Sequence, residues 1–314
     1  MTFLNILIFF AVSFCGLCIT SALSNKFNLY DIPDNDKIHL VKTANIGGIA
    51  IIFLILSSFI IYDYLYDEIL IFSLCVVIIL IGFIDDVRNF NAISKIILIS
   101  IPVIFFVINI SEVKDLGNIL GYDLNLGKFS FLFTFLCMLL LINATNYMDG
   151  LDGLISLLAI LTLSGILILI PKDQWNFLIP IISFLIVFLF FNFGIFPKQF
   201  LGDSGSLGIG FILSSVSIYY TQVLELIHPT IIIWFLSFYV FEFLTINIIR
   251  VKNKKNLFKK DLNFIFNILN KKIGKFKTLF VCCLLKLFFL LNGYFFNYYI
   301  LYDYSILLFI IYFF

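Results

Sequence analysis

Apolar residues run along this chain in eleven long segments, which short polar stretches separate. The segments cover residues 2–23, 44–62, 68–84, 93–110, 130–145, 154–170, 176–196, 205–224, 229–250, 277–293 and 297–314. Most approach the length of about 20 apolar residues that an α-helix needs to cross a bilayer. The pattern predicts an all-α, polytopic membrane protein of ten or eleven transmembrane helices, in a single domain over residues 1–314. The count stays open because the last two segments are close enough to merge.

The composition excludes the other broad classes. Apolar residues make up 62% of the chain and charged residues 12%, with a mean hydropathy of +1.12. A soluble globule cannot hide so much apolar surface, and a chain with 41 Phe is not of the disordered type. A net charge of +1 gives no case for nucleic acid. No Lys or Arg precedes the first segment, so we expect it to stay as the first membrane helix rather than to act as a signal peptide.

The basic residues lie mostly on one of the two alternating sets of loops. This first set covers residues 24–43, 85–92, 146–153, 197–204 and 251–276. Together with the adjacent helix ends it holds 16 of the 20 Lys and Arg, whereas the second set holds three. Because basic loops stay in the cytoplasm, we expect the first set inside and the N-terminus outside.

Two adjacent carboxylates, Asp85 and Asp86, end the segment 68–84. They repel each other, and the C-terminus of a helix disfavours negative charge further. Such a pair shares a proton or meets a cation or a donor. The sequence leaves two interpretations open: a solvated helix end paired with Arg88, or a catalytic or metal-directed pair.

A second polar cluster follows the segment 130–145 and contains Asn143, Asn146, Asp149 and Asp152, with glycines among them. Amides and carboxylates at membrane depth are costly unless they have partners, and glycine permits close approach by a ligand. The next predicted helix begins here, and its free N–H groups favour an anion. A plain polar turn is the alternative.

Two further clusters complete the polar set. The stretch 202–206, Gly-Asp-Ser-Gly-Ser, opens another predicted helix, where backbone N–H groups can hold a phosphate and Asp203 can bind a bridging cation. The first polar loop offers Lys37 and His39 beside the membrane surface. All four clusters fall on the loops assigned to the cytoplasm. Hard oxygen ligands with Lys suit Mg²⁺ and phosphate, so we expect an active site at the cytoplasmic face.

In this order, the clusters resemble those of the polyprenyl-phosphate N-acetylhexosamine-1-phosphate transferases, glycosyltransferase family 4. The matching stretches are Asp31-x-Pro33 with Lys37-x-His39 and Gly47-Gly48, Gly82-x-x-Asp85-Asp86, Asn143-x-x-Asn146-x-x-Asp149-Gly-x-Asp152-Gly-Leu, and Gly202-Asp203-x-Gly205-Ser206. The motifs cover residues 25–210, and the remainder is similar in topology. The resemblance implies a multi-pass enzyme of the bacterial inner membrane.

The resemblance also implies the reaction: transfer of a sugar 1-phosphate from a UDP-N-acetylated sugar to undecaprenyl phosphate, with release of UMP and with Mg²⁺ as cofactor. This would be the first membrane step of a cell-envelope polysaccharide such as O-antigen. Transfer of phospho-N-acetylmuramoyl-pentapeptide in peptidoglycan synthesis is the alternative within the family. By resemblance, Asp85 and Asp86 are catalytic, and Asp203 and Asn146 bind the metal. The expected substrate-binding residues are Lys37, His39, Asn143, Asp149, Asp152, Gly202 and Ser204.

The loop 251–276 departs from the family. Many members carry there an Asp-Arg-x-His-x-His-His stretch that binds the nucleotide sugar, where this chain has Phe264, Phe266 and Asn267. Apolar residues recur at spacings of three and four between 257 and 273, which predicts an amphipathic helix in the membrane interface. The alternative is a solvated basic loop of the ordinary positive-inside kind. We expect this helix to wall the sugar pocket and to favour a less hydroxylated sugar, such as a UDP-6-deoxy-N-acetylhexosamine.

Two functions of other classes remain as alternatives. Glu242 and Lys286 are intramembrane charges, which are typical of transporters, and their similar depths would let them pair. The polar clusters, however, lie on one face and not at a midplane, which argues against transport. The second alternative is a non-catalytic, lipid-binding relative.

Overall fold

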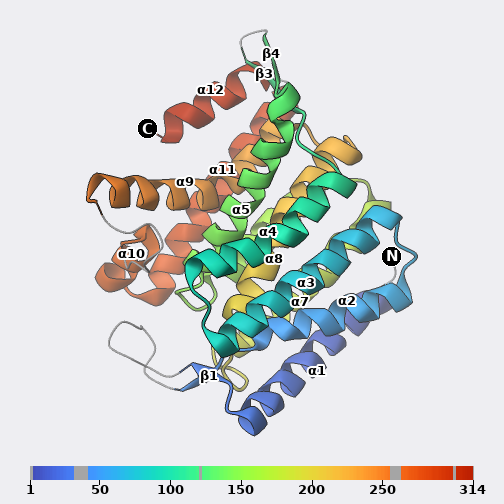
Figure 1. The fold of residues 1–314 in the computed structure, drawn as a ribbon, viewed down its shortest axis with the longest axis vertical. Coiled ribbons are helices and arrows are strands. Elements are labelled where there is room, and N and C mark those ends of the chain that lie inside the picture. Colours follow the sequence, from blue (N-terminus) through green and yellow to red (C-terminus); the bar gives the residue numbers. More distant parts are fainter. Residues whose placement is uncertain (1–2, 32–41, 120–121, 255–262, 300–301, 314) are drawn as a thin grey trace.

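The computed structural model describes residues 3–31, 42–119, 122–254, 263–299 and 302–313, and it is almost entirely helical (Figure 1). The helices are α1 Phe3–Phe27, α2 Ala50–Ile61, α3 Tyr66–Arg88, α4 Ala92–Asn109, α5 Ser130–Met148, α6 Leu154–Leu169, α7 Trp175–Asn192, α8 Gly202–Ile218, α9 Pro229–Lys252, α10 Ile265–Ile273, α11 Lys275–Tyr299 and α12 Tyr302–Phe313. Short turns η1 to η4 cover Gly47–Ile49, Gly127–Phe129, Lys172–Gln174 and the π-helical Tyr219–Val223. Strand β1, Tyr30–Asp31, pairs antiparallel with β2, Thr43–Ala44, and β3, Asp115–Ile119, pairs with β4, Tyr122–Asn125.

Each of the eleven predicted apolar segments overlaps one of these helices along most of its length, so the prediction of a nearly all-α fold is confirmed. Among the described residues, seven helices are long and apolar enough to cross a membrane. They are Phe3–Phe27, Tyr66–Arg88, Ala92–Asn109, Gly127–Met148, Lys172–Asn192, Pro229–Lys252 and Lys275–Tyr299. Three shorter apolar helices span Gly47–Ile61, Leu154–Leu169 and Tyr304–Phe313. A total of ten or eleven crossings therefore stays a prediction.

Helix α8 lies inside the bundle, against α3 and α5. Sixteen of its 17 residues are buried, and only Asp203 in its first turn is partly exposed. Glycines let the neighbours come close: a Cβ on Gly208 would lie 2.7 Å from Ile79 of α3, and one on Gly210 would lie 2.7 Å from the Cα of Ile142 of α5. The bundle can enclose α8 because small residues form much of its surface.

The predicted amphipathic helix of the loop 251–276 is present as α10, at residues 265–273, whereas residues 255–262 lie outside the described part. Phe266 and Asn267 of α10 are buried, and Ile265 and Ile268 are exposed. The helix therefore docks on the bundle through one face. That its exposed apolar residues enter a membrane interface stays a prediction.

Glu242 and Lys286, which similar depths would let pair, have other partners in the structure. Glu242, in α9, accepts a hydrogen bond from the backbone N–H of Ile265 at 3.4 Å. Lys286, in α11, is fully buried, donates to the carbonyl of Phe235 and lies 4.8 Å from the centroid of the Tyr239 ring. Helical spacing alone gave the two charges similar depths, but it could not show that they point at different neighbours.

The close packing of α8 on α5 gives a stability test. Gly210→Ala should lower the melting temperature in detergent, with a loss of about 1–3 kcal/mol in the free energy of unfolding, because the new methyl group overpacks the backbone of α5. Gly150→Ala is the matched control, since its Cβ would meet Phe266 at an ordinary 3.5 Å. Equal melting temperatures for Gly210→Ala and the unchanged protein would contradict the packing of α8.

Candidate active site

The carboxylate of Asp86 closes the N-terminus of α8. Its Oδ1 accepts hydrogen bonds from Nδ2 of Asn45 at 3.0 Å and from the N–H of Asp203 at 2.9 Å, and its Oδ2 accepts from the N–H of Ser204 at 3.1 Å. The residue before α8, Leu201, has no side chain that could cap the helix. Asp86 therefore satisfies N–H groups that the helix leaves open, and its negative charge is favourable at this end of the helix dipole.

Glycines make this contact between α3 and α8 possible. Gly202 has a φ of +70°, and a Cβ there would lie 2.3 Å from the carbonyl oxygen of Asn45 and 2.6 Å from Oδ2 of Asp86. Gly82 lies one turn before Asp86, and its Cβ would come within 2.6 Å of the backbone of Asp203. Only glycine fits at both positions, so the predicted substrate-binding Gly202 has a clear role in the approach of the two helices.

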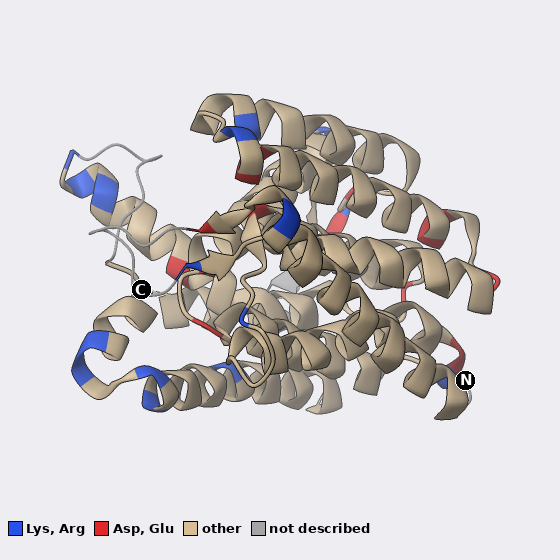
Figure 2. Ribbon diagram, turned by 90° about the horizontal axis from the view of Figure 1, so that it is seen from below, with Lys and Arg blue, Asp and Glu red and all other residues tan. Residues whose placement is uncertain are grey.

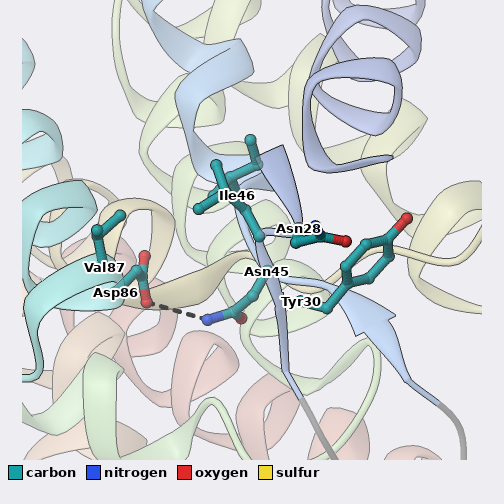
Figure 3. A pocket seen from close by; sticks show the side chains of 7 residues that line it. Asn28, Tyr30, Asn45, Ile46, Asp86 and Val87 are labelled. Atoms are coloured by element: carbon teal, nitrogen blue, oxygen red, sulfur yellow. Dashed lines mark hydrogen bonds between the residues drawn. The ribbon is translucent and has the colours of Figure 1, made fainter. Parts of the chain in front are cut away.

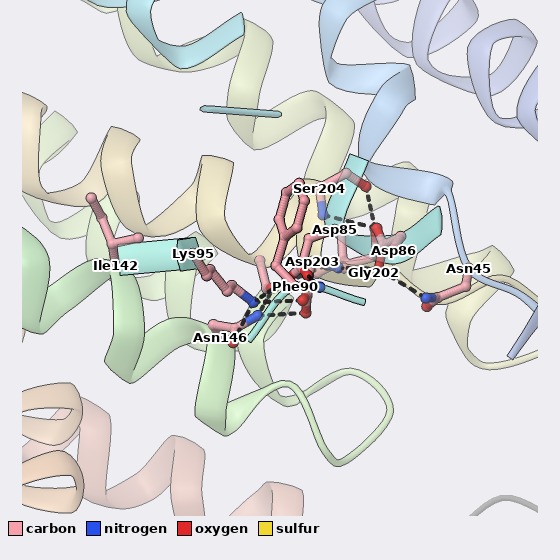
Figure 4. Close-up of polar contacts among 12 residues, drawn as sticks. Asn45, Asp85, Asp86, Phe90, Lys95, Ile142, Asn146, Gly202, Asp203 and Ser204 are labelled. Atoms are coloured by element: carbon pink, nitrogen blue, oxygen red, sulfur yellow. Dashed lines mark hydrogen bonds and ion pairs between the residues drawn. The ribbon is translucent and has the colours of Figure 1, made fainter. Parts of the chain in front are cut away.

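Lys95, in the first turns of α4, lies at the centre of the polar cluster (Figure 4). Its Nζ is 2.5 Å from Oδ2 of Asp203, 3.0 Å from Oδ2 of Asp85 and 3.3 Å from Oδ1 of Asn146. The amide of Asn146 in turn donates to Oδ1 of Asp203 at 2.8 Å and to Oγ of Ser206 at 2.9 Å. Four side chains from α3, α4, α5 and α8 thus converge on one point, with an ammonium group between two carboxylates.

The backbone also helps to hold Asp85. Its Oδ1 accepts from the N–H of Phe90 at 2.7 Å, while its Oδ2 faces Lys95. The ion pair that the structure gives to Asp85 is with Lys95, whereas the sequence interpretation of a plain helix end proposed Arg88. Asp85 and Asp86 therefore point to different partners, Asp85 towards the cation and Asp86 towards the start of α8.

The turn between α5 and α6 carries a second ion cluster. Oδ2 of Asp152 accepts from Nζ of Lys198 at 2.8 Å and from Nζ of Lys275 at 2.6 Å. Asp149 follows directly on α5 in a partly exposed position. Asn143 donates to the carbonyl of Leu139 within its own helix at 2.7 Å. Asp152 is thus held by charged neighbours from distant parts of the chain.

A cavity of about 160 Å³ opens on the other side of Asp86 (Figure 3). It lies beside the β1–β2 hairpin, and Asn28, Tyr30, Asn45 and Asp86 contribute polar or aromatic groups to its wall. Lys37 and His39 belong to the loop that this hairpin closes, and they lie outside the described residues. Ser204 is fully buried and its hydroxyl donates to the carbonyl of Leu201 at 3.1 Å. A contact of Lys37, His39 or Ser204 with substrate stays a prediction.

Comparison with known proteins finds a family that this chain resembles. Residues 68–221, just under half of the chain, match the sequence model of glycosyl transferase family 4. The matched stretch contains Asp85, Asp86, Lys95, Asn146 and Asp203, and the match supports the family resemblance predicted from the motifs.

Several relatives carry names that describe an activity. The chain is 25% identical over 260 residues to the undecaprenyl-phosphate alpha-N-acetylglucosaminyl 1-phosphate transferase of Escherichia coli, covering 79% of this chain and 70% of the relative. It is 28% identical over 299 residues to the protein of the same name from Thermotoga maritima, covering 94% and 91%. It is also 28% identical over 216 residues to the phospho-N-acetylmuramoyl-pentapeptide-transferase of Listeria welshimeri, covering 62% and 66%.

Lys95 is a residue of this candidate site that sequence reasoning did not assign. Its signal was its position: a Lys close to the N-terminus of an apolar helix faces the positive end of the dipole, which is unfavourable without an anionic partner. This position therefore indicates that Lys95 needs a carboxylate nearby, and Asp85 and Asp86 lie within ten residues of it on the preceding helix. Asn45 gave no comparable signal, because its contact with Asp86 depends on the fold of the first hairpin.

The contact between Asp86 and α8 can be tested apart from catalysis. Asp86→Asn should lower the free energy of unfolding by about 1–2 kcal/mol, because it removes a charge and one acceptor from the start of α8. Thermal unfolding in detergent measures this effect. Asp63→Asn, at an exposed position outside the cluster, should leave the melting temperature unchanged. If both variants melt like the unchanged protein, Asp86 does not support α8.

Proposed function

We propose that this protein transfers a sugar 1-phosphate from a UDP-N-acetylated sugar to a polyprenyl phosphate such as undecaprenyl phosphate, and releases UMP. The observation that carries the proposal is the convergence of Asp85, Lys95, Asn146 and Asp203 within the stretch that matches glycosyl transferase family 4. The names of the relatives from Escherichia coli and Thermotoga maritima support the same reaction.

The chemistry is a phosphoryl transfer between two anions. An oxygen of the lipid phosphate forms a bond to the phosphorus attached to the sugar, and the bond from that phosphorus to the oxygen of UMP breaks. Catalysis of such a step is mostly positioning and charge stabilisation. The ammonium of Lys95 can stabilise negative charge on the transferred group, and Asp85 beside it can orient the lipid phosphate or hold its proton. Asp86 acts indirectly, because it fixes the turn that carries Asp203.

We further propose that the site binds Mg²⁺. The carboxylates of Asp85 and Asp203 and the amide oxygen of Asn146 are hard donors, and they already surround one cationic group. Among the described residues, no three His, Cys, Asp or Glu side chains are grouped to hold a metal. Magnesium commonly takes one or two carboxylates together with substrate phosphates, which fits this donor set. When bound it would neutralise charge on the diphosphate.

The charge distribution supports a placement in the membrane. Figure 2 shows most Lys and Arg towards one end of the molecule, opposite the N-terminus of α1. Lys198, Lys271, Lys272 and Lys275 belong to loops or helix ends on the side of the polar cluster. By the positive-inside rule this end faces the cytoplasm and the N-terminus lies outside. We propose ten or eleven crossings of the bacterial inner membrane, with the site at the cytoplasmic face where a soluble UDP-sugar is available.

Transfer into a cell-envelope polysaccharide is the pathway that we propose. The N-acetylglucosaminyl relative from Thermotoga maritima aligns over 94% of this chain, whereas the pentapeptide transferase aligns over 62%. Transport is less well supported, because Glu242 and Lys286 have local partners and do not form a polar path between them.

Release of UMP gives a direct test. Purified protein incubated with undecaprenyl phosphate, Mg²⁺ and a panel of UDP-N-acetylated sugars should release UMP and form a lipid-linked sugar diphosphate with at least one of them. Asp203→Asn should reduce this turnover at least about 100-fold, roughly 2.7 kcal/mol of barrier, because it removes the carboxylate nearest to Lys95. Ser237→Ala, a buried change in α9 away from the cluster, is the control. Near-normal turnover of Asp203→Asn would exclude its assigned role.

The segment at α10 gives a second test, of sugar preference. The ring of Phe266 lies next to Gly150, because a Cβ added to Gly150 would be 3.5 Å from that ring. The ring of Phe264 lies edge-on to the ring of Tyr147. This apolar wall next to the α5–α6 turn supports a preference for a less hydroxylated sugar. In competition between a UDP-6-deoxy-N-acetylhexosamine and UDP-N-acetylmuramoyl-pentapeptide, kcat/KM should be higher for the deoxy sugar. A clear advantage of the pentapeptide substrate would rule this preference out.

A further inference from the structure

Two buried amide side chains connect the parts of the polar site that lie far apart in the sequence. Asn192 ends α7 and Gln199 lies in the segment that leads from α7 to Asp203, with exposed fractions of 5% and 0%. Neither takes part in the cluster around Lys95. Buried amides are costly unless their donors and acceptors are used, and the bonds of these two residues show what they hold.

Asn192 links the α5–α6 turn to the segment before α8. Its Oδ1 accepts from the N–H of Gly153 at 2.5 Å, and its Nδ2 donates to the carbonyl of Gln199 at 2.8 Å. Gly153 follows directly on Asp152, and Gln199 lies four residues before Asp203. One side chain therefore sets the distance between the turn with Asp149 and Asp152 and the turn with Asp203.

Gln199 anchors the same segment to α1. Its Nε2 donates to the carbonyl of Leu17 at 2.6 Å, and its Oε1 accepts from Oγ1 of Thr20 at 2.9 Å. The anchor has the hydrogen-bonding pattern that only an amide side chain provides, with one donor and one acceptor used at once. Together, Asn192 and Gln199 form a chain of hydrogen bonds from Gly153 to α1 without exposure to water.

The backbone completes the connection to the first loop. The N–H of Phe200 donates to the carbonyl of Ala44 at 2.8 Å, and the N–H groups of Gly47 and Gly48 donate to the carbonyls of Phe200 and Leu201, both at 3.0 Å. The segment before α8 is thus held on one side by the first loop and on the other by Asn192. It has little secondary structure of its own, so these bonds decide where it lies.

We infer that Asn192 is a positioning residue: it fixes the α5–α6 turn relative to the Asp203 turn, so that both can hold one UDP-sugar in the geometry of transfer. This inference rests on the proposed function, because it assigns the two turns to one substrate. Gln199 secures the arrangement against α1. A displacement of about 1 Å between groups that must act together can reduce a rate by up to about 100-fold.

The variants follow from the hydrogen bonds. Asn192→Leu has a similar shape and loses both bonds. Asn192→Asp keeps an acceptor for the N–H of Gly153 but turns a second oxygen towards the carbonyl of Gln199. Ser237→Ala is the matched control, because Ser237 is fully buried and its hydroxyl bonds only to Trp234 within its own helix.

Steady-state kinetics with the preferred UDP-sugar should separate positioning from direct binding. We expect both Asn192 variants to lower kcat by about 10- to 100-fold, with KM for the UDP-sugar changed by less than about threefold. The control should keep both values. A raised KM with unchanged kcat would mean that Asn192 binds the nucleotide sugar itself, and would overturn the inference, as would unchanged kinetics.

Hydrogen–deuterium exchange gives a readout that does not need activity. In Asn192→Leu, amide exchange should rise in both 149–154 and 198–204, while it stays unchanged in Ser237→Ala. A rise confined to one of the two segments, or none, would show that Asn192 does not connect them. If the unchanged protein releases no UMP from any UDP-sugar, the proposed function fails, and the exchange measurement still decides whether Asn192 couples the two turns.

Discussion

A helix that begins inside a bundle needs acceptors for its first N–H groups, and in this protein one carboxylate supplies them. Water cannot satisfy the start of α8, because nearly the whole helix is enclosed. Asp86 accepts from two of its N–H groups and thereby joins the end of α3 to the start of α8. Once this joint is made, Asp203 stands next to Lys95, and the other carboxylate of the pair, Asp85, meets the same ammonium. This contact therefore serves both the fold and the site.

Much of the architecture could be predicted from the sequence, because the bilayer imposes a length on every apolar segment. The eleven segments found in the sequence each overlap a helix, and the clusters at 85–86, 146 and 203 meet in space. Their meeting could be inferred only from their order and from the resemblance to a family. The physics of a polar residue at membrane depth says that it needs a partner, but not which one.

The full set of interaction partners of the charged side chains could not be predicted from the local sequence. The position of Lys95 signalled the need for one carboxylate, yet three acceptors from three other helices surround it. The sequence around Asp152 did not indicate its ion pairs with two lysines, because one of them, Lys275, is more than a hundred residues away in the sequence. Glu242 and Lys286 were given similar depths and nevertheless point at different neighbours. For the residues within helices, the answer lies in how the helices are rotated about their axes, and an almost uniformly apolar helix carries little information about its rotation.

The interior position of α8 has a consequence for how the chain enters the membrane. α8 is not among the seven helices that are long and apolar enough to cross a membrane alone, and its surface of Gly and Ser suits protein neighbours better than lipid. During synthesis α3 and α5 emerge before α8, so its two main packing partners are already available when it leaves the ribosome. Its insertion should therefore depend on their prior assembly, which makes biogenesis of this protein an ordered process in which the segment bearing Asp203 joins a bundle that has already begun to form.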